Sequence, residues 1–194
     1  MEEEQLGGRF VDLFAETIPI MQNVKKGFFA EKLETVGENK TAFKEMVKKR
    51  VPAVQKIMDS PEKTEQQKQF LILLPSFQMI GMALENLIDK MERKLQLKIL
   101  FSEKAIAEIK ELYTTLEKQF GDIKDYVSTG DPILKAEAKT DWERICKLID
   151  EYAVFHQNRL IAGICVPQAS YLYLDIVDSI KRTSRGLLDF TEKV

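Results

Sequence analysis

A regular row of apolar residues constrains the fold of this chain more than any other feature. Its members are spaced three or four residues apart: Ile106, Ile109, Leu112, Leu116, Phe120, Ile123 and Val127. This spacing places one apolar stripe along an α-helix of about seven turns. Ser102 precedes the stripe as its expected N-cap. A helix of this kind buries its stripe against other elements, so the row predicts a bundle.

Two further helices are predicted in the second half. In the sequence STGDP, Gly130 ends one helix, Asp131 caps the next and Pro132 occupies its first turn. The stripe after this turn comprises Leu134, Ala138, Trp142, Ile145, Ile149 and Tyr152. Pro167 opens a last helix, whose inward residues are Tyr173, Ile176, Val177, Ile180 and Leu187.

The first half starts with a helix that carries Phe10, Phe14 and Phe28, with Pro19 and Gly27 as expected irregularities. The residues GENK, at 37–40, then predict a turn. A second helix is expected from there onward, beginning at position 41 and carrying these apolar residues: Phe43, Met46, Val47, Val54 and Ile57.

Ser60 followed by Pro61 predicts the start of a third, long helix in the first half. Its inward residues are Phe70, Leu73, Phe77, Ile80, Leu84, Leu87 and Met91. No alternating run with hairpin turns indicates a strand. The sequence therefore predicts an all-α protein with six long helices.

The two halves repeat the same apolar pattern. A shift of the chain by 96 residues aligns Phe77 with Tyr173, Ile80 with Ile176, Leu84 with Ile180 and Met91 with Leu187. We expect two antiparallel three-helix bundles, over residues 1–99 and 100–194, packed as one compact domain.

Composition excludes several classes of protein. Hydrophobic residues make up 44% and charged residues 31% of the chain, which is typical of a globular protein. The formal net charge of −2 argues against nucleic-acid binding. No uninterrupted apolar run approaches a membrane span, and the acidic start MEEEQLGG does not resemble a signal peptide. We therefore expect a cytoplasmic protein without membrane insertion, with Cys146 and Cys165 as free buried thiols.

The second half resembles the PhoU-like family of phosphate-regulatory proteins. The resemblance is carried by FSEKAIAEIKELYTTLEK, then STGDPILKAEAKTDWERICKLIDEYAVFHQNRL, then PQASYLYLDIVDSIKR. It is closest to the version fused behind sodium/phosphate cotransporters, while the first half fits mainly by helix order. The resemblance implies a six-helix fold in two three-helix repeats. It also implies a non-enzymatic cytoplasmic regulator of phosphate transport or phosphate signalling that requires no cofactor.

The partners implied by the resemblance are a phosphate transporter or membrane transporter domain and a sensor kinase, with a homodimer as a further option. The family signature is an E/D-x-x-x-D pair in the third helix of each repeat, which implies a divalent or iron-type metal ion. In the first repeat, the matching residues are Glu85 and Asp89, in ALENLID. In the second repeat, Lys181 and Arg185 stand there, and cations cannot ligate a metal.

Simpler interpretations compete with each candidate site. Glu85 and Asp89 lie one turn apart, and Glu92 could add a third ligand, but Asp89 could instead pair with Arg93. Glu137 with Asp141 is the other E-x-x-x-D pair and a second candidate for metal binding, although surface charge is its favoured interpretation.

Lys181 and Arg185 could bind an anion or a partner protein. Ion pairs along their own helix, with Asp178 and Asp189, are the favoured interpretation. His156 is the only histidine and is expected to be packed rather than catalytic.

Two other functions stay open. One is a metal-binding helical bundle unrelated to phosphate; a di-iron centre is disfavoured because the chain has no E-x-x-H motif. The other is a structural oligomerisation module, which long amphipathic helices permit. The first is distinguished by metal content, and the second by oligomeric state.

Overall fold

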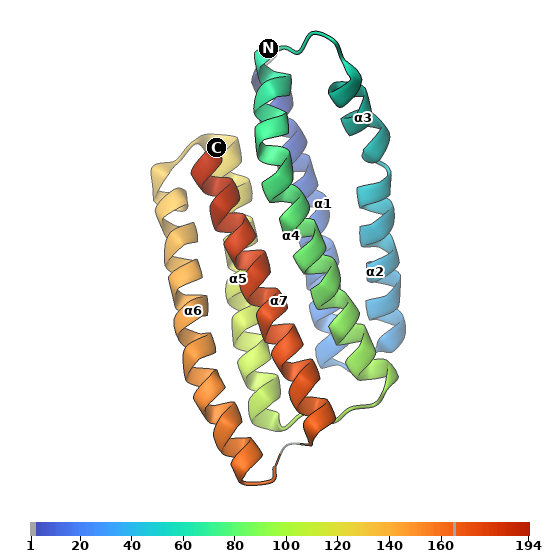
Figure 1. Ribbon diagram of the computed structural model, residues 1–194, viewed down its shortest axis with the longest axis vertical. Helices are drawn as coiled ribbons and strands as arrows, with labels where there is room; N and C mark the ends of the chain where they lie inside the picture. The colour runs from blue at the N-terminus through green and yellow to red at the C-terminus, as the bar shows by residue number, and fades with distance from the viewer. Residues whose placement is uncertain (1–2, 165) are drawn as a thin grey trace.

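The computed structural model describes residues 3–164 and 166–194, and side chains from position 10 onward within these ranges. The described residues form seven helices and no strand, so the predicted all-α class is confirmed (Figure 1). The helices are α1 (Glu3–Phe29), α2 (Leu33–Lys48), α3 (Val51–Asp59), α4 (Glu65–Gln96), α5 (Glu103–Thr129), α6 (Pro132–Ile161) and α7 (Pro167–Lys193). Cys165 lies outside the described residues.

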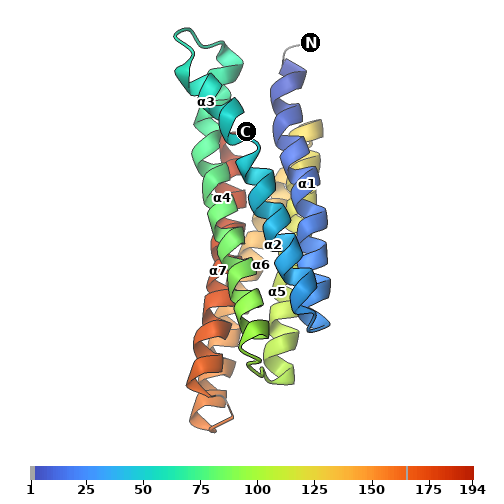
Figure 2. The ribbon, with the colours of Figure 1, turned by 90° about the vertical axis from the view of Figure 1, so that its right-hand side faces the viewer.

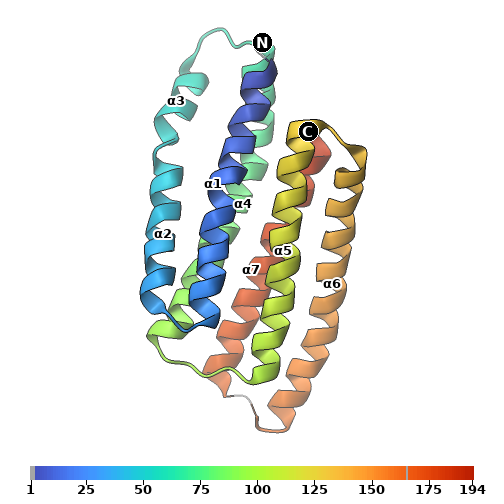
Figure 3. The ribbon, with the colours of Figure 1, turned by 180° about the vertical axis from the view of Figure 1, so that it is seen from behind.

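The helices run roughly parallel to one long axis and pack in two neighbouring groups. Helices α1, α2 and α4 contact one another, as do α5, α6 and α7 (Figures 1 and 3). The groups join where α4 packs on α7 and α1 packs on α5. Whether the halves are sequence repeats with a boundary at residue 99 stays a prediction, because helix packing does not test it.

A cluster of phenylalanine rings ties the two groups together. The Phe14 ring lies 5.7 Å from Phe77, 5.9 Å from Phe120 and 5.6 Å from Phe190, centroid to centroid. These rings come from α1, α4, α5 and α7, and they meet edge to face, an arrangement that adds to the energy of burial. Phe10 and Phe70 extend the cluster at the same end of the molecule. The hydrophobic core is therefore continuous across both groups.

The first half departs from the predicted boundaries. The predicted turn at 37–40 is wrong, because these residues lie inside α2. The chain turns earlier, at residues 30–32, where Glu31 has a φ of 54° and the main-chain N–H of Lys32 donates to the carbonyl of Gly27. Helix α1 continues through Pro19 and Gly27. Packing of α2 against α4 thus overrides the turn composition of GENK.

The second and third predicted helices also start elsewhere. The expected helix from Thr41 is instead α2 followed by a short α3, because Pro52 at the start of α3 cannot continue the α2 hydrogen-bond ladder. Ser60 is the C-cap of α3 rather than an N-cap. Helix α4 begins after Thr64, which forms a capping box with Gln67.

The capping predictions of the second half are confirmed. Ser102 accepts a hydrogen bond from the Ala105 N–H at 3.2 Å, and Asp131 accepts one from the Ile133 N–H at 2.9 Å. Gly130 adopts the left-handed conformation, with φ of 70°, that the predicted helix end requires. Pro167 lies in the first turn of α7.

Helix α4 is long and apolar enough, by length and composition, to cross a membrane, and it is the only such helix among the described residues. Counting uninterrupted apolar runs does not reveal this helix, because polar residues such as Ser76, Gln78 and Asn86 interrupt its runs. These polar residues are mostly uncharged, so the helix as a whole remains apolar. Core helices of water-soluble proteins meet the same test. Only 33% of the apolar window is buried, so α4 leaves apolar surface uncovered.

Candidate functional site

The predicted pair Glu85 and Asp89 contacts lysines of α2. Helix α2 packs beside α4 (Figure 2). The ammonium of Lys40 lies 2.6 Å from the Asp89 carboxylate and 2.8 Å from that of Glu92. Lys44 contacts Glu85 at 3.1 Å. All three carboxylates therefore have a lysine of α2 as their counter-ion. We call Glu85, Asp89 and Glu92 the α4 acidic face.

This arrangement decides what the acidic face can do. The hydrogen bonds that Lys40 donates to Asp89 and, with a smaller effect, to Glu92 raise the pKa of Lys40. A metal ion bound there has to displace this ammonium group. Within 3–164 and 166–194, no group of three or more His, Cys, Asp or Glu side chains is placed to hold a metal. Asp89 pairs with Lys40 across the bundle rather than with Arg93, the partner that helix spacing suggested.

Glu137 and Asp141 also meet around a lysine. The ammonium of Lys118 lies 2.8 Å from Glu137, 3.2 Å from Asp141 and 2.7 Å from Asp122. Burial tends to lower the pKa of Lys118, but these three hydrogen bonds together raise it. Burial also raises the pKa of Asp141, against the opposing effect of Lys118. The pair is thus part of an ion cluster between α5 and α6.

Lys181 and Arg185 differ in their contacts within the described part of the chain. Arg185 pairs with Asp189 at 2.8 Å, as its position one turn earlier predicted, and its guanidinium lies 5.6 Å from the centre of the Trp142 ring. Lys181 makes no ion pair in the described part of the chain. The neighbouring pair of Asp178 and Arg182 forms at 2.7 Å.

Sequence reasoning missed a buried polar network at the other end of the second group. Arg159 of α6 donates to both carboxylate oxygens of Glu108 on α5, at 2.6 and 2.8 Å. The Tyr173 hydroxyl of α7 donates to the same carboxylate at 2.6 Å. Both partners of the ion pair continue apolar stripes at helical spacing, Glu108 after Ala105 and Arg159 after Tyr152. A charged residue at such a position was the signal that could have found them.

His156 extends this network towards the surface. Its Nε2 lies 2.7 Å from the Ser170 hydroxyl, and its ring stacks on Tyr173 with centroids 4.9 Å apart. Burial, followed by the charge of Arg159, lowers the pKa of His156, while Glu108 opposes the effect. The expectation of a packed, hydrogen-bonded histidine is confirmed.

A cavity of about 410 Å³ opens beside His156. It lies between the α4–α5 connection and the start of α7, and we call it the end cavity. Its apolar wall is formed by Leu97, Ile99, Leu100, Phe101, Ile164 and Val166. The polar groups on its lining include His156, Ser102, Gln168 and Ser170. An apolar enclosure with a few convergent polar groups is the usual form of a small-ligand site.

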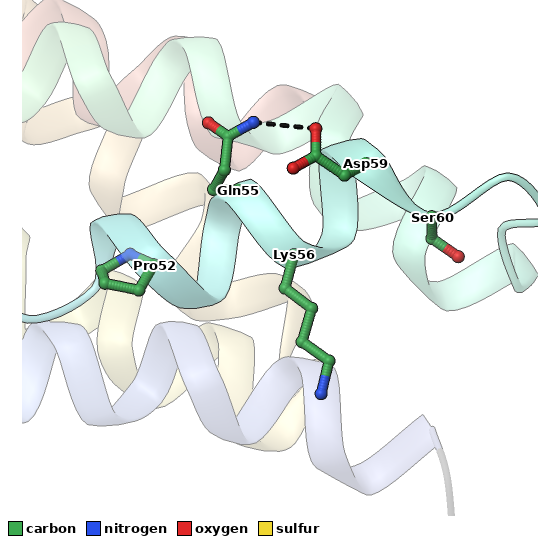
Figure 4. A pocket seen from close by; sticks show the side chains of 5 residues that line it. All are labelled: Pro52, Gln55, Lys56, Asp59 and Ser60. Atoms are coloured by element: carbon green, nitrogen blue, oxygen red, sulfur yellow. Dashed lines mark hydrogen bonds between the residues drawn. The ribbon is translucent and has the colours of Figure 1, made fainter.

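A larger depression, of about 630 Å³, lies beside α3 (Figure 4). Its lining residues, Pro52, Gln55, Lys56, Asp59 and Ser60, all belong to α3 or its C-cap, and Gln55 already donates to Asp59 at 2.8 Å. In Figure 4 the Lys56 side chain points away from the Gln55–Asp59 pair. No second element contributes a polar group, so this surface does not enclose a ligand.

Comparison with known proteins adds no relative. No family model, no curated protein and no solved structure matches this chain. The class defined by the fold is an all-α helical bundle, and its function has to be argued from its own surfaces.

Proposed function

We propose that this protein is a non-enzymatic, PhoU-like regulator of phosphate transport or phosphate signalling that acts through protein contacts. The resemblance of the second half to that family suggests the process. The paired state of the acidic groups supports binding rather than catalysis: the carboxylates on α4 and on α6 are held by Lys40, Lys44 and Lys118.

An exposed apolar row on α4 carries the proposal. Ile72, Met79 and Met82 are 56%, 63% and 68% exposed, and their spacing puts them along one line of the helix. We call them the α4 row. Methionine side chains adapt to the shape of a partner, and they are common on surfaces that bind apolar helices. Met91, further along the same helix, is by contrast fully buried.

The neighbouring surface of α7 indicates which partner fits. Helix α7 packs along α4 and carries the exposed ion pair of Asp178 with Arg182. An apolar row on α4, with charges of both signs on the adjoining helix α7, matches an amphipathic helix with an apolar face and charged flanks. The partner in this proposal is such a segment on the cytoplasmic side of a phosphate transporter.

The test is phosphate uptake in cells that lack the protein. We expect deletion to change the rate of uptake of labelled phosphate, and wild-type protein to restore it. A variant with Ile72→Glu, Met79→Glu and Met82→Glu should fail to restore it. The control variant carries Ile133→Glu and Val154→Glu, since both residues are more than half exposed elsewhere on the surface. Normal uptake in the deletion strain contradicts the proposal.

Self-association through the same row is the competing function. Light scattering of the purified wild type and of the triple α4-row variant distinguishes the two. A dimer that dissociates in the variant, together with unchanged uptake, favours an oligomerisation module. A monomer in both cases, together with altered uptake, favours the regulator.

A further inference from the structure

The end cavity presents a strongly apolar mouth to solvent. Leu100 is 81% exposed, Ile164 is 64% exposed and Val166 is 60% exposed, yet all three line the same space. Beneath them, Ile99, Ala169 and Leu172 form a small core of their own that joins the α4–α5 connection to α7. The apolar wall is therefore held by packed residues, while its outer surface is in contact with water.

The inner end of the cavity is polar, and one of its groups is incompletely bonded. His156 is 5% exposed and lines the cavity. Its Nε2 is bonded to Ser170, but its Nδ1 has no hydrogen-bond partner among the described residues. A ring nitrogen without a protein partner, on a side chain that lines the cavity, is available to a ligand that enters it.

Three features give this end a positive character. Val166, the N-cap residue of α7, makes no side-chain capping hydrogen bond. Gln168 and Ala169 line the cavity in the first turn of α7, where main-chain N–H groups have no partner within the helix. Lys98 is the one charged residue among the described residues that line the cavity. Helix starts and a lysine together favour a negative group.

We propose that the end cavity binds an amphipathic anion, namely a soluble aliphatic acid whose chain lies between Leu97 and Val166. The anionic head contacts the first-turn N–H groups of α7, with His156 and Lys98 beside it. The volume of about 410 Å³ falls within the range of about 300–1,000 Å³ that is usual for small-ligand sites. This binding function is separate from the α4 row and does not depend on phosphate regulation.

The probe is decanoate, used below its micelle-forming concentration, with decanol and acetate as comparisons. Decanol keeps the chain without the charge, and acetate keeps the charge without most of the chain. Binding is measured by calorimetry and by amide chemical shifts in nuclear magnetic resonance. We expect decanoate to bind at least about tenfold more tightly than either comparison. We also expect it to shift the amide signals of Gln168 and Ala169.

Two surface variants and a matched control complete the test. Leu100→Glu puts a negative charge at the apolar mouth, and Lys98→Asn removes the positive charge while tolerating the left-handed φ of 51° at that position. We expect about tenfold weaker decanoate binding for the first and about threefold weaker for the second. Ile133→Glu, at the opposite end of α6, should leave binding unchanged.

Several results overturn the proposal. If decanol binds as tightly as decanoate, the anionic head group does not contribute to binding. If acetate binds as tightly, the aliphatic chain does not contribute. If the Leu100→Glu and Ile133→Glu variants bind decanoate with equal affinity, the binding site is not the end cavity. If the protein sediments with anionic phospholipid vesicles and decanoate shifts no amide signal, the cavity region binds a membrane surface rather than a soluble ligand.

Discussion

Arg159 donates two parallel hydrogen bonds to Glu108, and neither residue is more than 7% exposed. The pair links α6 to α5, and the Tyr173 hydroxyl of α7 contributes a further hydrogen bond to the same carboxylate. Three helices thus share one buried charge pair. Its contribution to stability depends on both partners staying together, since an ion left alone in the interior loses its solvation without compensation.

Breaking this pair from one side should be far worse than replacing it. We expect Arg159→Met to lower the free energy of unfolding by about 3–5 kcal/mol, because it leaves the Glu108 charge unpaired. The double variant Arg159→Met with Glu108→Met should recover much of that loss. Urea unfolding of the wild type, both single variants and the double variant forms a complete cycle. Additive losses contradict a coupled pair.

The phenylalanine cluster should make the two helix groups unfold together. Phe14 is fully buried among rings from both groups. We expect Phe14→Ala to lower the free energy of unfolding by about 3–5 kcal/mol. Helix content and tryptophan fluorescence from Trp142, which lies in the second group, should follow one transition. The exposed Phe155→Ala should change stability by less than about 0.5 kcal/mol. Two separate transitions contradict the prediction.

Removing Lys40 should expose a latent cation site. In Lys40→Met, Asp89 and Glu92 lose their shared counter-ion. We expect Mn²⁺ to bind at least about tenfold more tightly than to the wild type, measured by the paramagnetic resonance signal of free Mn²⁺. Addition of Asp89→Ala should abolish the gain. Lys90→Met, which removes an ion pair to Asp175 instead, is the control. No gain in Lys40→Met counts against metal binding at Glu85 and Asp89.

His156 should make stability depend on pH in a defined window. Its folded pKa is lowered, chiefly by burial, so below about pH 6.5 the unfolded chain binds a proton that the folded chain does not. The free energy of unfolding therefore falls as the pH drops from about 6.5 towards the folded pKa. The slope is at most about 1.4 kcal/mol per pH unit. Above pH 6.5 the contribution is complete.

Urea unfolding at pH 7.5 and pH 5 measures this effect. We expect the difference between the two pH values to shrink in His156→Gln. Glu31 and Glu111 also have lowered pKa values, through hydrogen bonds to Lys94 and Tyr152, but their contribution is lost only below about pH 4.5. An unchanged difference in His156→Gln rules out His156 as its source.

Two glycines should respond in opposite ways to alanine. A Cβ atom on Gly186 of α7 would lie 2.9 Å from Cγ1 of Ile80 on α4, whereas one on Gly81 would meet no atom within 4 Å. Gly81→Ala should stabilise the protein by about 0.5–1 kcal/mol through helix propensity. Gly186→Ala should destabilise it by about 1–3 kcal/mol through overpacking. Thermal unfolding of both variants tests the close contact of α4 with α7. Stabilisation by Gly186→Ala contradicts it.

Sequence signals predicted the second half more accurately than the first, for a local reason. Ser102, Gly130 and Asp131 are strong capping residues, and each acts as its type suggests. The turn after α1 has no such signal, because Glu31 adopts a left-handed backbone conformation that glycine adopts most often. Its position is set by contacts of α2 with α1 and α4, which depend on residues distant in sequence.

The same limit applies to the sites. Spacing along one helix placed Glu85 and Asp89 on a common face and paired Arg185 with Asp189. It could not show that Lys40 of another helix neutralises Asp89. The apolar mouth of the end cavity is formed by two connections between helices. Neither connection has a periodic pattern, so sequence alone gave no sign of it.

The contact between Phe10 and Phe190, with ring centroids 5.1 Å apart, has a consequence for biosynthesis. The earliest described helix and the latest one share a single aromatic cluster. Helix α7 is synthesised after all the other described helices. Until it emerges from the ribosome, the phenylalanine side chains of α1 and α4 lack their packing partners from α7. Chaperones that shield nascent apolar surface should therefore engage this chain throughout most of its translation and release it when α7 arrives.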